Sequence, residues 1–349
     1  MSVRLLSTRS VLVCFSASAV SALFGLAYTT ILDGDKLFGV VAGAILAFPI
    51  VVFEVLIVHG RIGEGLRRMP LWELTLISAS VWIVSIAAAI LLITPAILDL
   101  ENFPNWYDEK RFAQDLIVSL IVVLLINFSV RILSLMGGRV LINFLLGRYY
   151  RPLREQQVFM FVDFLDARGM SRRLGDLRAQ SLISAVLFDI DASVTEFGGE
   201  NHRYFGDELV VTWPLRRAVK DGRCLRCALE IIRQLRANAR RYHDKFGEAP
   251  RLRIALHGGW VVASEIGDDR REIVYFGDTI NTAARLRGLA KKIRRNLVVS
   301  AALLDQIRVP EGVRSEDMGA FTLSGKAQPT RVYALHGAHE EPAAVGVSG

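Results

Sequence analysis

Hydrophobic positions follow two different patterns along the chain. Through residue 136, long apolar stretches alternate with short polar loops, and the stretches cover residues 10–32, 37–58, 71–98 and 116–136. A helix needs about 20 apolar residues to cross the hydrocarbon core of a bilayer. The pattern therefore predicts a four-helix transmembrane domain over residues 1–136. Its first helix is too long, and too closely followed by the second, for a cleaved signal peptide.

The charges of the loops predict how this domain is oriented. Arginines lie before the first span, in the 59–70 loop and after the last span, whereas the 99–115 loop is mainly acidic. By the positive-inside rule, we expect both termini, and everything after residue 137, on the cytoplasmic side of the cell (inner) membrane. Glu54 lies at membrane depth and is a candidate for ligand or ion binding. Nothing in the apolar spans identifies the signal or ligand that the membrane domain senses.

Shorter elements follow from residue 137 onward. Residues 137–155 begin with two glycines and continue as an amphipathic stretch, which indicates a membrane-proximal connector. Strand and helix patterns then alternate, which indicates one α+β domain over residues 156–337. The expected elements are a strand (158–164), a helix (171–187), a strand hairpin (188–213), a helix (216–246), a strand pair (251–276) and a helix (278–290). Residues 338–349 lack an apolar period and are expected to form a disordered tail.

Composition changes this picture only a little. The mean hydropathy of +0.35 is high for an ordinary soluble protein and reflects the apolar first part. The net charge of +7 comes largely from arginines in the loops and on helix surfaces, so we predict no nucleic-acid partner. Cys224 and Cys227 form a lone C-x-x-C pair, and no second pair exists to complete a zinc site or a disulfide framework.

Two carboxylates carry the first chemical signal. Asp163 ends the apolar strand FMFVDF, and Asp207 follows Gly206 in the hairpin sequence RYFGDELVV. An acid at the end of an apolar strand must be solvated, paired or bound to a cation. Two hard oxygen ligands without histidine or cysteine beside them suit Mg²⁺ or Mn²⁺ carried on a phosphate substrate. The alternative is a pair of ordinary surface carboxylates.

A third motif adds a cation and an amide. The sequence YFGDTINTAARL, over residues 275–286, predicts a strand, a glycine turn and a helix on which Asn281 and Arg285 share one face. An arginine so placed can stabilise charge on a transferring phosphoryl group, and an asparagine can orient a sugar oxygen. The alternative is a polar pair on an exposed helix face.

Together these motifs resemble those of class III nucleotidyl cyclases. The similar stretches are FVD ending at Asp163, GENHRYFGDELVVTW from residue 199, LHGG from residue 256 and YFGDTINTAARL from residue 275. The resemblance covers about residues 155–335 and is to the bacterial, membrane-anchored branch. It implies a multi-pass α-helical membrane domain followed by an α+β, ferredoxin-like catalytic domain.

The resemblance also implies a mechanism. Asp163 and Asp207 would bind two metal ions, Mg²⁺ or Mn²⁺, and the ribose 3′-oxygen would attack the α-phosphorus with loss of pyrophosphate. Asn281 would hold the ribose, and Arg285 would stabilise the transition state. Each site would lie at the interface of a homodimer, with the acids from one subunit and the Asn/Arg helix from the other.

Three stretches depart from the family pattern. Asp166-Ala167-Arg168 replaces a small Gly-Phe-Thr or Gly-Ser-Thr turn whose amides cradle phosphate, so Arg168 would take over phosphate contacts, whereas Asp166 would repel phosphate unless it joins the metal. Arg203 and Val274 occupy the base-reading positions where adenylate-making members have lysine and aspartate. Lys326 lies near the family's phosphate-binding lysine, although Ser324 has the usual place.

We therefore expect a membrane-bound adenylate cyclase that converts ATP to 3′,5′-cyclic AMP and pyrophosphate. A guanylate cyclase is the near alternative, although the glutamate usual in guanylate-making members is also missing at Arg203. A catalytically silent cyclase-like domain that dimerises or regulates is another alternative. A diguanylate cyclase is disfavoured, because its Gly-Gly-Asp/Glu-Glu-Phe signature is not present around Gly206-Asp207-Glu208.

Overall fold

The structure is a computed structural model that describes two parts of the chain. Most of the description covers residues 147–268, 271–326 and 328–337; from the first part it covers 69–70, 72–84 and isolated positions between 18 and 53 and at 117 and 121. The chain divides into two compact units, Met1–Ile142 and Asn143–Gly349. Each unit is described by itself.

In the first unit, residues 72–84 form a helix that buries Leu74 and Trp82. Within the described residues, no helix is both long and apolar enough to cross a membrane. The predicted spans lie mostly outside those residues, and Glu54 and the tail 338–349 lie wholly outside them. The predicted membrane domain and its orientation therefore stay predictions.

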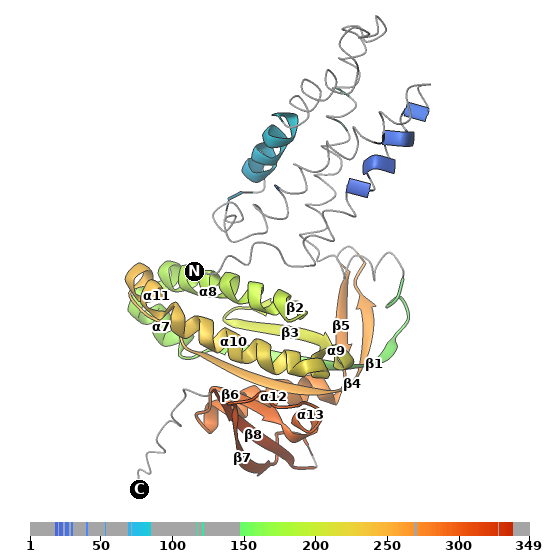
Figure 1. Cartoon of the computed structure of the whole chain (residues 1–349). Helices are drawn as coiled ribbons and strands as arrows, with labels where there is room; N and C mark the ends of the chain where they lie inside the picture. Colours follow the sequence, from blue (N-terminus) through green and yellow to red (C-terminus); the bar gives the residue numbers. More distant parts are fainter. Residues whose placement is uncertain are drawn as a thin grey trace, which may run out of the picture. The chain divides into compact units, whose positions relative to one another are not determined.

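The second unit is built on a mixed sheet of eight strands (Figure 1). The strand order is β2-β3-β1-β4-β6-β8-β7, and β5 pairs with the far end of β4. Antiparallel pairing places β1 between β3 and β4, and β4 is parallel to β6. The strands are β1 (Leu153–Phe164), β2 (Glu200–Phe205), β3 (Glu208–Pro214), β4 (Leu252–Ile266), β5 (Glu272–Phe276), β6 (Leu297–Ser300), β7 (Arg314–Phe321) and β8 (Thr330–His336).

Helices cover both faces of this sheet. Along β1, Val158, Met160 and Val162 pack into a large core with six helices, whereas Phe159 and Phe161 face the opposite way, toward α12 (Asp278–Lys292). This alternation follows from the two-residue period of a strand. The six helices are α7 (Ala167–Leu174), α8 (Asp176–Glu196), α9 (Leu215–Val219), α10 (Arg223–Ala237), α11 (Ala239–Phe246) and α13 (Ala301–Leu304); the short helix η3 (Lys220–Gly222) completes the described helices of the unit.

Several predicted elements are confirmed, and one is wrong. The strand pair 251–276 and the helix from residue 278 appear as β4, β5 and α12. The strand predicted to begin at residue 188 is wrong, because α8 continues to Glu196. Val186, Ile190 and Val194 are buried at a spacing of four residues, and that spacing fits both a strand and a helix.

The hairpin was predicted to turn around Gly198-Gly199, but these glycines link α8 to β2, and the hairpin turns at Gly206-Asp207. A Cβ on Gly199 would lie 2.6 Å from the Trp213 ring, so this glycine lets β2 pack closely. Two predicted helices are also divided. Gly175 separates α7 from α8, and the predicted helix 216–246 is divided into α9, η3, α10 and α11. Strand β1 begins at Leu153, five residues before the predicted strand.

Candidate active site

The two predicted metal acids lie at one corner of the sheet. Asp163 is one residue from the end of β1 and stands opposite Glu208 at the start of β3. Asp207 lies in the turn just before β3, after Gly206 with φ +60°, and its backbone oxygen accepts the N–H of Phe164 at 3.4 Å. Pairing of β1 with β3 thus brings together two acids that are far apart in the sequence.

The electrostatics of this corner are mixed. Burial raises the pKa of Asp163, and nearby Asp207 raises it further, because two like charges oppose ionisation. The cations Arg287, Arg253 and Lys291 lower that pKa, but the net shift is upward. A carboxylate held in this way is stabilised by any additional positive charge.

Arg253, on β4, is the buried cation of the corner. It is only 7% exposed, and its Nη1 lies 3.4 Å from Asp163 Oδ2. Its Nε is buried without a hydrogen-bond partner among the described residues. Burial lowers the pKa of this guanidinium, and Asp163 raises it again. Sequence reasoning missed Arg253, although a charged residue inside the apolar run LRIALHGG was a signal.

Helix α12 supplies the other cations on this side. Arg287 forms an ion pair with Glu208, which is next to Asp207 in the chain. Lys291 lies one turn further along the same side of the helix, and its charge lowers the pKa of Asp163. The acid corner is therefore partly neutralised from within the chain.

The residues at this corner fit one kind of metal. Across the described part of the chain, no group of three or more His, Cys, Asp or Glu residues could hold a metal ion. Two neighbouring carboxylates suit a hard divalent cation that takes its remaining ligands from water and phosphate. The donor set is thus consistent with Mg²⁺ or Mn²⁺ and inconsistent with a structural zinc site.

The Asn/Arg pair lies on a different side of α12. Asn281 is exposed, and Arg285 lies against the 322–326 loop, where a Cβ on Gly325 would come within 3.1 Å of Arg285 Nη2. Arg285 and Arg287 are two residues apart, so they point about 200° apart around the helix. Within one chain, the structure does not bring Asn281 and Arg285 to the acid corner.

Lys326 lies on the same side of α12 as Arg285. Its Nζ is 2.9 Å from Asp278 Oδ2 at the first residue of the helix, and this contact lowers the pKa of Asp278. Beneath them, His257 Nδ1 lies 2.7 Å from Ser300 Oγ. Burial and the charge of Lys326 lower the pKa of His257 to about 4, so the imidazole is neutral at pH 7.

Two glycines on β4 permit close packing on opposite faces of the sheet, and Gly259 is the one that faces the start of α12. Thr279 Oγ1 donates to the Trp260 carbonyl at 2.7 Å, and a Cβ on Gly259 would lie 2.8 Å from that hydroxyl. A Cβ on Gly258 would lie 3.0 Å from Val158 on the other face. The LHGG motif is therefore a packing device that fixes where α12 begins.

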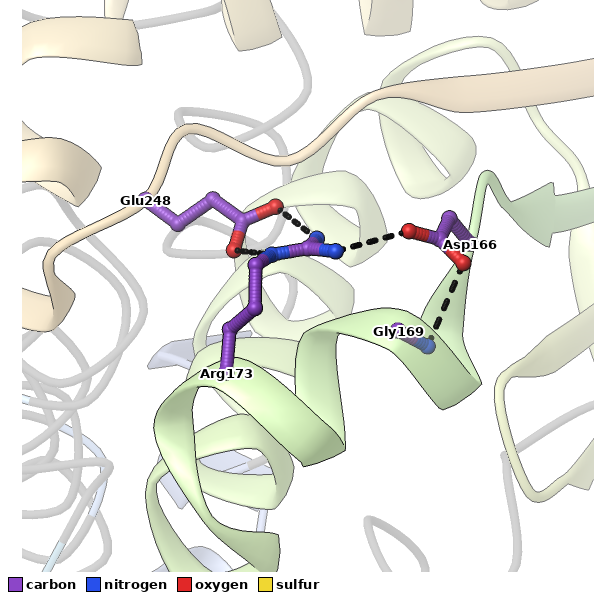
Figure 2. Close-up of polar contacts among 4 residues, drawn as sticks. All are labelled: Asp166, Gly169, Arg173 and Glu248. Carbon is purple, nitrogen blue, oxygen red and sulfur yellow. Dashed lines mark hydrogen bonds and ion pairs between the residues drawn. The ribbon is translucent and has the colours of Figure 1, made fainter.

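The turn after Asp163 holds Asp166 by contacts within the chain. The Asp166 carboxylate caps α7 and binds Arg173 (Figure 2). The hydrogen bond from Arg173 holds the pKa of Asp166 below its usual value. Arg168 is exposed in the first turn of α7.

The two predicted base-reading positions are neighbours in space. Arg203 on β2 donates to Glu272 on β5 at 2.7 Å, and Val274 lies two residues further along β5, on the same face. His202 and Tyr275 stack edge to face beside them, with ring centroids 5.0 Å apart. Sequence reasoning missed Glu272, and its two-residue spacing from Val274 was the signal.

Comparisons with known proteins agree with this arrangement. The family model for the adenylate and guanylate cyclase catalytic domain matches residues 151–337. Adenylate cyclase 2 of Rhizobium meliloti is 35% identical over 89% of this chain and 86% of its own length. Adenylate cyclase 1 of the same organism is 24% identical over 53% of this chain and 28% of its own length. A solved bacterial light-regulated adenylyl cyclase aligns with TM-score 0.52 and 19% identity, over 62% of this chain and 63% of that one.

The fold and the acid corner therefore define the C-terminal unit as a class III cyclase catalytic domain. This chain belongs to the adenylate and guanylate cyclase family and is a nucleotidyl cyclase. The family description covers both ATP-using and GTP-using enzymes.

Proposed function

We propose that this protein is an adenylate cyclase that converts ATP to 3′,5′-cyclic AMP and pyrophosphate. The observation that carries the proposal is the meeting of Asp163 and Asp207 at one corner, in a chain that also presents Asn281 and Arg285 on one helix face. A 35% identical relative named as an adenylate cyclase supports the choice of reaction.

Asp163 and Asp207 would hold two divalent cations, Mg²⁺ or Mn²⁺, whose chemistry when bound is to lower the pKa of the ribose 3′-hydroxyl and to neutralise the triphosphate. Asn281 positions the ribose, so that the 3′-oxygen lies in line with the α-phosphorus. The new P–O bond forms as the bond to pyrophosphate breaks, and the hydroxyl proton leaves to water. Arg285 stabilises the charge on the phosphoryl oxygens, and Arg168 and Lys326 bind the triphosphate.

A homodimer with two sites follows from the position of α12. Within one chain, Arg285 points about 200° around this helix from Arg287, the residue that pairs with Glu208 beside the acids. A second copy, arranged head to tail, supplies the missing half of each site, so the monomer is inactive. Arg285 lies beside Gly325 at the surface of the unit, where a second chain can reach it.

In this proposal, Arg203 and Glu272 together recognise the base of the nucleotide. Arg203 offers a donor and Glu272 an acceptor, a pattern that matches N1 and the N6 amino group of adenine. Glu272 thereby supplies the carboxylate that is missing at Val274. The same pair fits O6 and N1–H of guanine, so guanylate cyclase is the second candidate.

We also propose that residues 1–136 form a four-helix domain in the cell (inner) membrane, with the catalytic domain in the cytoplasm. Of the predicted connector 137–155, the part before β1, residues 137–152, would link the two. The four apolar stretches and the arginine-rich loops support this location. Recovery of the full chain in the membrane fraction after an alkaline wash tests it; recovery in the supernatant contradicts it.

The reaction is tested with the purified full chain in detergent. With Mn²⁺ present, ATP and GTP are offered together, and both cyclic nucleotides are quantified. Predominant cyclic AMP supports the proposal, and predominant cyclic GMP makes the protein a guanylate cyclase. Absence of both products, while the protein stays folded, supports a silent regulatory domain.

A further inference from the structure

Asp166 has an unusual backbone conformation for a residue with a side chain. Its φ of 60° and ψ of 38° lie in the left-handed region, which glycine adopts most easily and aspartate tolerates. Its Oδ1 accepts the N–H of Gly169 at 3.2 Å and so caps α7. A Cβ on Gly169 would lie 2.1 Å from Asp166 Oδ2. Asp166 and Gly169 are therefore fitted to each other.

Arg173 holds this carboxylate from the last turn of α7. Its Nη1 lies 2.9 Å from Asp166 Oδ2 (Figure 2). The same guanidinium binds both carboxylate oxygens of Glu248, with distances of 2.6 Å from Nη2 and 3.1 Å from Nε. Glu248 follows α11 and lies 75 residues further along the chain than Arg173. A bidentate contact of this kind fixes the plane of the guanidinium.

The arrangement matters because of where Asp166 stands. It is three residues after Asp163, in the turn that faces the triphosphate in the proposed function. Arg173 lowers the pKa of Asp166, so the carboxylate is ionised at neutral pH. An ionised carboxylate that turned toward a triphosphate would repel it. Directed to Gly169 and Arg173, the same charge is paired with a cation that it shares with Glu248.

We propose that Arg173, held by Glu248, is a positioning residue that keeps the Asp166 carboxylate away from the triphosphate. The proposal rests on the proposed function, because it assigns the triphosphate to this turn. It explains how an acid can occupy a turn that usually contains glycine. It also gives Glu248, remote in sequence, an effect on nucleotide binding.

The test uses the full chain in detergent with Mn²⁺ and the preferred nucleotide. Arg173→Ala should raise KM about three- to tenfold, because it releases one negative charge near the phosphates, while kcat changes little. Glu248→Gln should act in the same direction but less strongly. The double variant Arg173→Ala/Asp166→Asn should return KM to nearly the wild-type value, because asparagine keeps the cap and the left-handed conformation without the charge. Arg178→Ala, which removes an exposed arginine on α8, is the matched control and should leave KM unchanged.

Two outcomes overturn the proposal. One is an unchanged KM in Arg173→Ala; the other is a double variant that is as impaired as Arg173→Ala. A purely structural role predicts a loss of kcat that Asp166→Asn does not reverse. Thermal unfolding midpoints of the single and double variants measure the Asp166–Arg173 coupling without turnover. Non-additive midpoints support the contact, additive midpoints contradict it, and a wild type without cyclase activity refutes the proposed function instead.

Discussion

The two sides of α12 gather charged side chains of opposite sign and compensate them to different extents. On one side, Asp163 and Asp207 concentrate negative charge, and buried Arg253 with Arg287 compensates part of it. On the other side, Arg285 and Lys326 concentrate positive charge, and a single acid, Asp278, faces Lys326. By formal charge, Arg253, Arg287 and Lys291 offset the three acids Asp163, Asp207 and Glu208, whereas the other side keeps one positive charge in excess. Each side is therefore suited to one half of a nucleotide complex, the acids to cations and the bases to phosphate.

The largest effect should come from the acid side. Asp163→Ala or Asp207→Ala should lower cyclase activity by at least about 10³-fold, roughly 4 kcal/mol of transition-state stabilisation, because each removes a proposed metal ligand. Steady-state assays with Mn²⁺ and ATP measure this loss. Asp244→Asn, at an exposed acid on α11, is the control and should be fully active. Full activity in Asp163→Ala would remove the acid corner from the mechanism.

A complementation experiment tests whether the two sides act across a dimer. Asp163→Ala and Arg285→Ala chains, each inactive alone, are co-expressed with different tags and purified through both. The mixed dimer should regain about half of the wild-type activity, because one of its two sites is intact. A mixed dimer of Asp163→Ala with Asp207→Ala should stay inactive, since both acids come from one subunit. Recovery in that control, or none in the first pair, contradicts the shared site.

The position of the helix between the two sides can be tested at Gly259. Gly259→Ala places a Cβ 2.8 Å from Thr279 Oγ1 and should displace the start of α12. We expect the free energy of unfolding to fall by about 1–3 kcal/mol, with a loss of activity. Gly288→Ala, in the same helix with open space around it, should instead add about 0.5–1 kcal/mol. Denaturant unfolding measures the free energy of unfolding of both variants. It thereby distinguishes the packing effect at Gly259 from the helix-propensity effect at Gly288.

The smallest expected effect is a pH dependence on the basic side. The pKa of His257 is lowered from its ordinary value of 6.5 to about 4 in the folded state, so the unfolded chain binds the proton more tightly. Stability should therefore be complete above about pH 6.5 and fall as the pH drops toward 4, with about 2 kcal/mol lost from this residue between pH 7 and pH 5. His257→Asn should reduce the difference in unfolding free energy between pH 7 and pH 5. An unchanged difference would show that His257 does not titrate in this window.

Much of the local structure could be predicted from patterns. The helix with Asn281 and Arg285, the strand pair before it and the position of Asp207 at a turn are confirmed. The assignment of 188–196 failed, because buried residues four apart fit two periods and only packing against the sheet decides between them. Arg253 and Glu272 escaped notice, since their importance depends on partners 90 and 69 residues away.

The family could be read from the sequence, because the motifs around Asp163, Asp207 and Asn281 combine residue types and spacings that their chemistry requires. The acid at position 166, where a glycine is usual, could be read there too. The partners of these residues came from the folded chain. Folding brought Arg253 to Asp163 and Arg287 to Glu208, and it directed both Asp166 and Glu248 to Arg173. Spacing sets which residues share an element and a face of it, whereas charge compensation depends on distances that packing fixes.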